Sequence, residues 1–179
     1  MIFEPFPPFV PNGFQIKFAV ERWEQRGAAA LRRQVFCDEQ RIFDCDDRDA
    51  IDEIAIPLVA LSSLAIVHDA VVGTVRIHES GSGVWWGSRL AVAESHRKVG
   101  ALGSALIRLA VSSAHARGCR QFFAHVQSRN VPLFRRMRWR TLRKIDLHGF
   151  EHHLMEADLD FYPPFAAPEV GFVALRKAA

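Results

Sequence analysis

Short runs of alternating or continuous apolar residues recur along this chain and predict β-strands, with turn residues between them. The segment from Ile56 to Glu79 predicts two strands that join near His68–Ala70. A hairpin is expected around Gly149, because apolar runs flank a glycine there. The other predicted strands cover residues 13–20, 84–92 and 121–126.

Three further segments place apolar residues three to four positions apart, which is typical of an amphipathic helix. They cover residues 23–36, 101–117 and 129–137, and Gly118 follows the second as a C-terminal cap would. The order of elements is roughly βααβββαβαββ, with no internal repeat and no linker. This order predicts a single α/β domain in which helices cover a mixed sheet.

Composition changes this picture little. The chain has 179 residues, 49% of them hydrophobic and 24% charged, which suits one globular domain. Its net charge of +3 gives no reason to expect a nucleic-acid partner, and no apolar run is long enough to cross a membrane. The three cysteines are irregularly spaced, which predicts reduced thiols rather than a disulfide framework or a zinc site. We therefore expect a cytoplasmic protein.

Both ends differ from the middle of the chain. Residues 1–12 form an arm rich in proline and phenylalanine, without the basic start and apolar core of a signal peptide. Residues 161–179 form a Pro/Ala-rich tail, which leaves 13–160 as the predicted domain. The arm or the tail could join two copies of the chain in a homodimer.

Acidic residues are concentrated in an irregular segment after the first predicted helix. Five carboxylates lie between Asp44 and Asp52 and suggest a calcium site. Their spacing is not that of an EF-hand loop, and no glycine provides its sharp turn. A solvated loop is the favoured interpretation.

A basic, glycine-containing turn lies within residues 89–109, RLAVAESHRKVGALGSALIRL, between a strand and a helix. A helix N-terminus exposes unpaired N–H groups and the positive end of the helix dipole. Gly100 and Gly103 would let a ligand approach the backbone, and Arg97 and Lys98 precede them. These features favour a phosphate site, although glycines that serve only the shape of the turn would explain them equally. The patterns of a P-loop and of a dinucleotide-binding fold are both missing.

The same stretch resembles the acyl-CoA motif of the GNAT superfamily of N-acyltransferases, Gln/Arg-x-x-Gly-x-Gly/Ala, and the likeness extends over roughly residues 13–159. It implies the GNAT fold, an α/β (α+β) structure whose mixed, mostly antiparallel sheet has six to seven strands flanked by about four helices. It also implies acetyl-CoA or another acyl-CoA as co-substrate, and no metal. The cofactor-binding residues that it implies are Leu90, Ala91, Val92, Arg97, Lys98, Gly100, Ala101, Gly103, Ser104, Asn130 and Phe134.

A second motif, NVPLFRRMRW at 130–139, resembles the GNAT segment Asn-x-x-Ala-x-x-Leu-Tyr-x-x-x-Gly-Phe. The resemblance gives Asn130 a cofactor contact and places Phe134 where the family has a tyrosine that protonates the departing thiolate. Phenylalanine has no proton to give. Upstream, LRRQVFCDEQ resembles GNAT proteins of the ElaA type, and the whole set of motifs is more similar to GNAT proteins encoded in bacterial nitrilase gene clusters. A weaker likeness is to acyl-homoserine lactone synthases.

Three residues are candidates for catalytic roles. Glu39 ends the first helical region and, by its likeness to the ElaA pattern, would orient or deprotonate the acceptor amine; a plain solvated carboxylate is the alternative. His125 could accept a proton near neutral pH, or be a hydrogen-bonded histidine within the sheet. Gln127 lies on the same side of its strand as His125. It also lies seven positions before Phe134, as a glutamine lies before the tyrosine in ElaA-type proteins, and by this likeness it is expected to contact substrate.

Other residues are candidates for the acceptor site. Arg76 and Arg89 lie on neighbouring strands and would either bind an anionic acceptor or pair with the acidic segment. Trp85 and Trp86 point to opposite faces of their strand, so one is expected in the core and the other, taken as Trp86, in the acceptor pocket.

Two clusters of basic residues near the hairpin carry weaker signals. His148, His152 and His153 suggest a metal, but strand alternation turns His152 and His153 to opposite faces. Four arginines between residues 135 and 140 suit a solvated helix face better than a nucleic-acid or CoA-phosphate site.

Together these expectations predict an acyl-CoA-dependent N-acyltransferase, most simply an N-acetyltransferase, that acts on a small-molecule amine. The amine would attack the thioester directly while both substrates are bound. Two alternatives remain open. One is acyl transfer to an amino acid derivative, as in the lactone synthases, and the other is a CoA-binding regulatory module without turnover.

Overall fold

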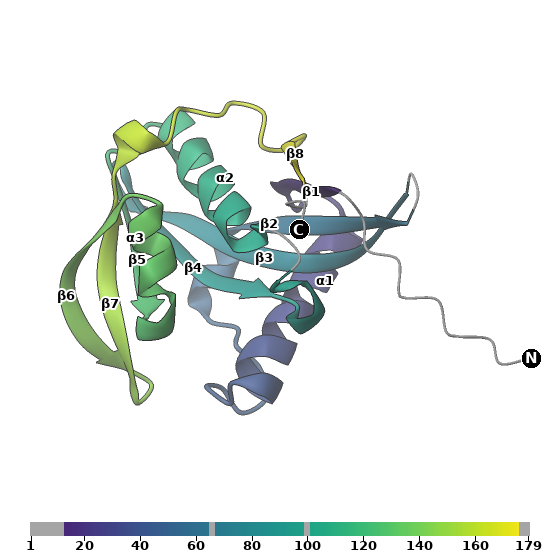
Figure 1. Cartoon of the computed structure of the whole chain (residues 1–179), viewed down its shortest axis with the longest axis horizontal. Coiled ribbons are helices and arrows are strands. Elements are labelled where there is room, and N and C mark those ends of the chain that lie inside the picture. The colour runs from purple at the N-terminus through teal and green to yellow at the C-terminus, as the bar shows by residue number, and fades with distance from the viewer. Residues whose placement is uncertain (1–12, 65–66, 99–100, 176–179) are drawn as a thin grey trace, which may run out of the picture.

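The structure is a computed structural model that describes residues 13–64, 67–98 and 101–175. Its centre is a sheet of eight strands in the order β6-β7-β5-β4-β3-β2-β1-β8 (Figure 1). β4 and β5 run parallel, and the other neighbouring strands run antiparallel. The strands are β1 (Gly13–Phe18), β2 (Ile56–Leu64), β3 (Val67–Gly81), β4 (Val84–Val92), β5 (Gln121–Gln127), β6 (Trp139–Leu147), β7 (Phe150–Ala157) and β8 (Phe172–Leu175).

The predicted α/β class and mixed sheet are confirmed, and two counts are corrected. The sheet has eight strands rather than six to seven, because part of the tail adds β8 beside β1. The described residues contain three α-helices rather than about four: α1 (Arg22–Arg33), α2 (Leu102–Ala116) and α3 (Val131–Arg136). The helix predicted over 23–36 is α-helical only to Arg33 and continues as a π-helical segment, Gln34–Glu39.

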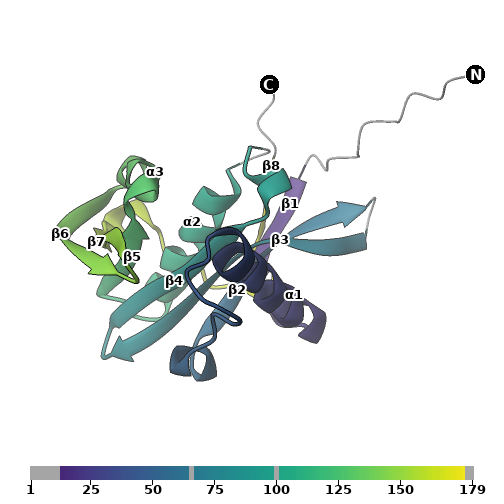
Figure 2. The same ribbon diagram turned by 90° about the horizontal axis from the view of Figure 1, so that it is seen from below.

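Helices cover both faces of the sheet (Figures 1 and 2). α2 and α3 lie on one face, where they bury the main core together with strand residues such as Ile16, Phe122 and Met155. α1 lies on the other face, where Ala28 and Leu31 pack into smaller clusters. Within the described residues, none of the helices combines the length and the apolar character needed to span a bilayer.

The prediction of a turn near His68–Ala70 is wrong. β3 pairs with β2 as far as Val67, opposite Leu64, so that His68 and Ala70 lie inside this ladder. The segment is mostly apolar and has no glycine or proline to mark a turn, which is why the pattern misplaced it.

The chain after β7 folds back on the domain. Tyr162 is fully buried, and its hydroxyl donates to the Met137 carbonyl at 2.7 Å and accepts from Nε1 of Trp139 at 2.9 Å. Burial raises the pKa of Tyr162 to about 12, so the phenol stays protonated and keeps both bonds. β8 then pairs with the outer edge of β1.

β4 and β5 are paired over only part of their length. Their parallel register runs from Val84 opposite Gln121 to Gly87 opposite Ala124, and no further pair follows within the described residues. Beyond Gly87 the two strands separate (Figure 2), as the family resemblance implies. Backbone groups on the facing edges of this splay have no strand partner there, which leaves them for a ligand or for side chains.

Candidate active site

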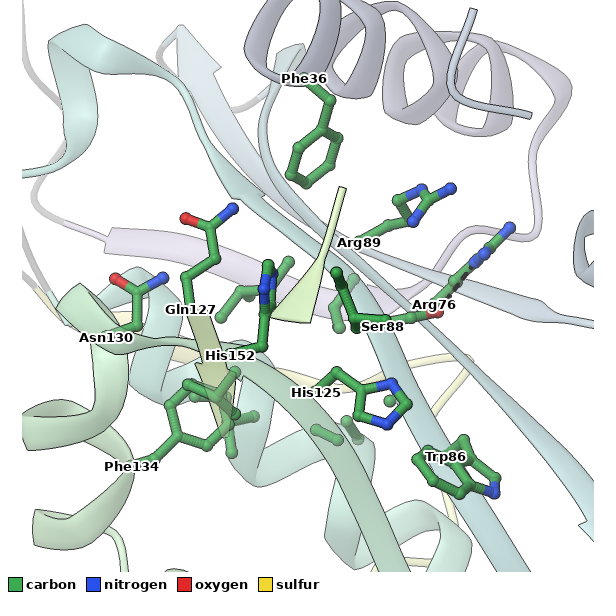
Figure 3. Close-up of a pocket in the computed structure, with 18 of the residues that line it drawn as sticks. Phe36, Arg76, Trp86, Ser88, Arg89, His125, Gln127, Asn130, Phe134 and His152 are labelled. Atoms are coloured by element: carbon green, nitrogen blue, oxygen red, sulfur yellow. Dashed lines mark hydrogen bonds between the residues drawn. The ribbon is translucent and has the colours of Figure 1, made fainter. Parts of the chain in front are cut away.

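A cavity of about 440 Å³ lies where β4 and β5 separate (Figure 3). Its lining comes from both faces of the sheet, so the cavity passes through the splay rather than lying on one surface. On the α2 face the lining belongs to the main core. On the α1 face it includes the π-helical segment and the acidic loop that follows it, residues 41–53.

The part of the cavity on the α2 face, here called the inner chamber, is apolar. Leu90 of the splayed part of β4 contributes to it, as does Phe134 of α3. Its lining residues are Val75, Leu90, Ile107, Ala110, Val111, Phe122, Ala124, Val126, Phe134 and Trp139.

The part on the α1 face, here called the outer chamber, is aromatic and polar. The centroid of the Trp86 ring lies 5.1 Å from that of His125, whereas the neighbouring Trp85 is buried in the main core. His78 also lines this part, and its Nδ1 is buried without a hydrogen-bond partner in the described structure. The turn between β6 and β7 reaches across to the acidic loop, where the rings of His148 and Phe43 lie 5.0 Å apart. These rings favour an acceptor with an apolar body.

Alternating arginine and aspartate side chains form a closed ring beside the outer chamber. Around this charge ring the order is Arg32, Asp47, Arg89, Asp49, Arg76 and Asp52. Asp47 is almost fully buried, and its Oδ2 lies 2.7 Å from Nε of Arg32 and 2.9 Å from Nε of Arg89. One carboxylate therefore joins α1 to β4.

The other two aspartates close the charge ring through Arg76, whose side chain is 2% exposed. Asp49 accepts two hydrogen bonds from its guanidinium group, at 2.7 and 2.8 Å. Asp52 lies 2.7 Å from Nη1 of Arg76 and 2.5 Å from Nη1 of Arg32. Three positive and three negative groups balance, so the charge ring brings no net charge to the outer chamber.

The charge ring corrects one prediction and resolves another. A solvated acidic loop is wrong for Asp47, which pairs in the interior. Of the two uses predicted for Arg76 and Arg89, the structure shows the pairing with the acidic segment. Hydrogen bonds from Arg76 lower the pKa of Asp49. Burial would raise the pKa of Asp52, but hydrogen bonds from its arginine partners outweigh burial and lower it.

A β-bulge in β4 turns two successive side chains toward the α1 face. The β3–β4 register shifts beside Arg76, which lies opposite Ser88. The next residue, Arg89, has a φ of 56°, in the left-handed region that residues other than glycine rarely occupy. Ser88 accepts a hydrogen bond from Arg76 at 2.9 Å, while Cζ of Arg89 lies 4.5 Å from the Phe43 ring centroid. In a regular strand, without the bulge, the side chains of Ser88 and Arg89 would lie on opposite faces of the sheet.

His152 of β7 has a fixed tautomer and lines the cavity. Its Nδ1 lies 2.8 Å from the carbonyl oxygen of Phe150, which can only accept, so Nδ1 carries the proton. Nε2 is left with a lone pair, and Figure 3 shows the ring between Gln127 and Ser88. Sequence reasoning considered His152 only as a metal ligand. The informative signal is its place opposite Gln127 in the sheet, which required the strand pairing.

His125 lines the outer chamber from β5, as its predicted parity with Gln127 requires. Its pKa is lowered mainly by partial burial and also by electrostatic interactions with His152 and Arg143. The ring is therefore neutral at pH 7 and able to accept a proton.

The two remaining catalytic candidates lie differently. Gln127 lines the cavity, and its Nε2 donates to Oε1 of Gln40 at 3.0 Å. Gln40, at the end of the π-helical segment, is a lining residue to which the sequence assigned no role. Glu39 instead forms an ion pair with Arg97 and does not belong to the lining found in the described residues.

The turn before α2 is described on both sides of residues 99–100, so Gly100 lies outside the described residues. Ala101 is the N-cap of α2, and no described side chain caps the helix. Amides of the first turn are thus available to a ligand. A Cβ at Gly103 would lie 3.8 Å from its nearest neighbour, so packing within the chain does not require glycine there. Such an uncapped, open N-terminus fits a diphosphate.

The remaining predicted cofactor residues surround this turn. Ala91 is buried against α1, and the Val92 carbonyl accepts from Nε of Arg97 at 3.0 Å. Lys98 is exposed and Ser104 is half-buried in the first turn of α2.

Asn130 and Phe134 both line the cavity, at the start and within the body of α3. Phe134 is buried, and its ring meets that of Trp139 edge-on at 5.0 Å. Both positions are close enough to the splay to contact a ligand held in it.

The described residues contain no group of three or more His, Cys, Asp or Glu side chains that could hold a metal ion. His152 lines the cavity, whereas Nδ1 of His153 lies 3.2 Å from the Thr141 hydroxyl. The four arginines between residues 135 and 140 are exposed.

Residues 21–138 match the family model described as "Acetyltransferase (GNAT) family". The chain belongs to the GNAT acetyltransferase family. This GNAT protein has the splayed β4–β5 pair and the open helix N-terminus at the positions expected from its motifs. No protein of curated function matches its sequence.

Solved structures share the GNAT fold at low sequence identity. A proposed N-acetyltransferase from Lactobacillus plantarum has a TM-score of 0.72 at 21% identity, covering 82% of this chain and 98% of the other. Escherichia coli ElaA has a TM-score of 0.68 at 17% identity, covering 81% and 98%. The acyl-homoserine lactone synthase BjaI, solved with SAM and isopentyl-CoA, has a TM-score of 0.66 at 18% identity, covering 89% and 93%. At these identities the likeness concerns the fold alone.

Proposed function

We propose that this GNAT protein transfers an acyl group from acyl-CoA to the amine of a small molecule by direct attack in a ternary complex. The observation that carries the proposal is a cavity that passes through the β4–β5 splay, with an apolar chamber on one face and a histidine-lined chamber on the other. A thioester held in the splay would then meet donor and acceptor environments at once.

Coenzyme A would be held from the α2 face. The uncapped amides of the first turn of α2, around Gly103, would bind its diphosphate, and Arg97 and Lys98 would add positive charge. The pantetheine arm would follow the free edge of β4 at Leu90–Val92, with Asn130 on the opposite wall. A backbone amide on that edge would donate to the thioester oxygen as negative charge develops there.

The amine would enter the outer chamber beside Trp86. Its nitrogen attacks the thioester carbon, the C–S bond breaks, and the ammonium proton passes to Nε2 of His152. Because Nδ1 of His152 is committed to Phe150, only Nε2 can accept this proton. Neutral His125 is the second candidate acceptor. Phe134 cannot protonate the thiolate, so the thiolate takes its proton from water, or directly from the ammonium ion in place of the transfer to His152.

Glu39 and Gln127 take supporting roles in this proposal. Glu39, paired with Arg97, would steady the basic turn, and Gln127, bonded to Gln40, would shape the acceptor entrance. The charge ring holds Arg76 and Arg89, which disfavours an acceptor carboxylate bound by them. We also propose membership of the subgroup encoded with nitrilases, which rests on the sequence motifs alone.

The proposal is tested by mixing the protein with acetyl-CoA and a panel of small primary amines and following the release of free thiol. Amine-dependent release, with the N-acyl product identified by mass spectrometry, is the expected result. CoA binding without release for any amine or acyl chain would favour a regulatory module. Release that depends on an amino acid derivative such as S-adenosylmethionine would favour the lactone-synthase alternative.

A further inference from the structure

The apolar lining of the inner chamber extends from the splay into the protein core. It is bounded by the middle of α2, at Ile107, Ala110 and Val111, and by Phe122 and Trp139 on the far wall. Apart from Leu90, its lining residues belong to the buried core of the domain. The chamber is thus continuous with the splay but lies inside the packed interior.

Space of this kind is unusual in a folded core. Protein interiors pack as densely as organic crystals, and lining atoms that face a void lose their dispersion contacts. Small residues keep this space open, because Ala110 and Ala124 lie where larger apolar side chains would fill it. Gly87 lets the Phe122 ring pack against the β4 backbone, since a Cβ there would lie 3.0 Å from Cε1 of that ring. A ligand that completes the packing would recover the missing contacts.

The walls of the inner chamber select an apolar ligand. Among its lining side chains only Trp139 carries a polar atom, and that Nε1 already donates to the Tyr162 hydroxyl at 2.9 Å. A polar or charged group placed here would lose its hydration without gaining a partner.

We infer that the inner chamber binds the acyl chain of the donor, and that the preferred donor is an aliphatic acyl-CoA with a chain longer than acetyl. This inference rests on the proposed function, because it is the thioester in the splay that directs the chain inward. The carbonyl would stay at the β4 edge, and the chain would run past Phe134 toward Ala110 and Phe122.

Calorimetry on the whole chain tests this without knowledge of the acceptor. The probes are CoA, acetyl-CoA, butanoyl-CoA, hexanoyl-CoA and decanoyl-CoA. Each methylene that enters the chamber is expected to tighten binding about fourfold, until the chamber is full and affinity levels off or falls. Equal affinity for all esters, or weaker binding with each added carbon, would overturn the inference and leave the proposed function intact. No binding of CoA itself would overturn both.

A pair of variants tests where the acyl chain lies. Ala110→Met fills the chamber and should remove the gain for hexanoyl-CoA while leaving acetyl-CoA binding within about twofold. Ala116→Met makes the same change at an exposed position of α2 and should keep the gain. If Ala110→Met does not fold, Ile107→Ala enlarges the chamber and should move the plateau to a longer chain. A gain for hexanoyl-CoA that survives Ala110→Met, or a plateau that stays at the same acyl length in Ile107→Ala, would contradict this placement.

Discussion

The two chambers of the cavity are built on opposite faces of one sheet and by different physics. The inner chamber needs only apolar side chains of suitable size, which strand alternation and one helix face supply. The outer chamber needs ionised groups near a reacting centre, and each has to find a partner. Arg32, Asp47 and Arg76, for example, come from three separate elements and meet only in the folded chain. Removing a group should therefore have larger effects on the outer side, where partners are left unpaired.

The largest effect is expected from His152→Gln. It removes the Nε2 lone pair that would accept the amine proton, and kcat should fall by about 10²- to 10⁴-fold. Binding of CoA by calorimetry should be unchanged, because His152 lies on the acceptor side. Thiol release with a responsive amine is the measurement.

His153→Gln is the matched control, since it changes the next residue of the same strand outside the cavity lining. Its kcat should stay within a few-fold of the parent value. A loss below tenfold in His152→Gln would move the proton acceptor to His125, and the His125→Gln variant would then show the large loss.

Asp47→Asn should produce the largest change in stability. The substitution leaves Arg32 and Arg89 without the carboxylate that bridges them in the interior, and we expect about 3 kcal/mol less free energy of unfolding. Urea denaturation measures it. Asp44→Asn, at an exposed position of the same loop, should change stability by less than about 0.5 kcal/mol. Equal effects of the two would mean that the charge ring does not stabilise the fold.

The charge ring also predicts sensitivity to acid. The pKa of Asp52 is lower in the folded than in the unfolded protein. Its contribution to the free energy of unfolding is therefore complete above its unfolded pKa of about 4 and is lost as the pH falls toward the folded pKa. The urea midpoint should therefore decline below about pH 4. The Asp52→Asn variant should have a lower midpoint at neutral pH and a flatter pH dependence in that window. A parallel decline in both proteins would assign the acid sensitivity to other groups.

On the inner side, Tyr162→Phe tests the wall behind the chamber. The change removes one hydroxyl and leaves Nε1 of Trp139 and the Met137 carbonyl buried without that partner. We expect a loss of about 1–3 kcal/mol in the free energy of unfolding. Phe161→Leu, at the exposed neighbouring position, serves as control. If the free energy of unfolding of Tyr162→Phe were unchanged, water would have replaced the hydroxyl.

The smallest effect is expected at Glu39, which lies outside the cavity lining. Glu39→Gln breaks an exposed ion pair with Arg97, which is typically worth about 0–1 kcal/mol. Its kcat should change by less than tenfold, with a modest rise in the Kd for CoA. A hundredfold loss in kcat would instead make Glu39 the group that deprotonates the amine.

Much of the fold could be predicted because it depends on local periodicity. β4 was predicted with its observed bounds, and α2 and β5 each to within one residue at either end. The turn between β2 and β3 was misplaced because its segment lacks turn residues, and β8 was missed because four residues after a proline-rich stretch carry little pattern.

The site was harder to predict because it depends on residues far apart in the chain. Leu90, Asn130 and Phe134 were found through motifs, and all three line the cavity. The charge ring was foreseen only in part: pairing of Arg76 and Arg89 with the acidic segment was one of two predicted uses, but no spacing reveals that Arg32 shares a carboxylate with Arg76. His152 was missed for a similar reason, because its role depends on strand pairing and on a backbone carbonyl.

Position 89 illustrates how such a site limits redesign. Glycine would lower the steric strain of the left-handed backbone there by about 1–2 kcal/mol. A design procedure that optimises local backbone geometry would therefore choose glycine at this position. The same change would delete the guanidinium that anchors Asp47 and stacks on Phe43. At this residue, relief of backbone strain would cost the interactions of the side chain, so a thermostabilised version of the protein should keep Arg89.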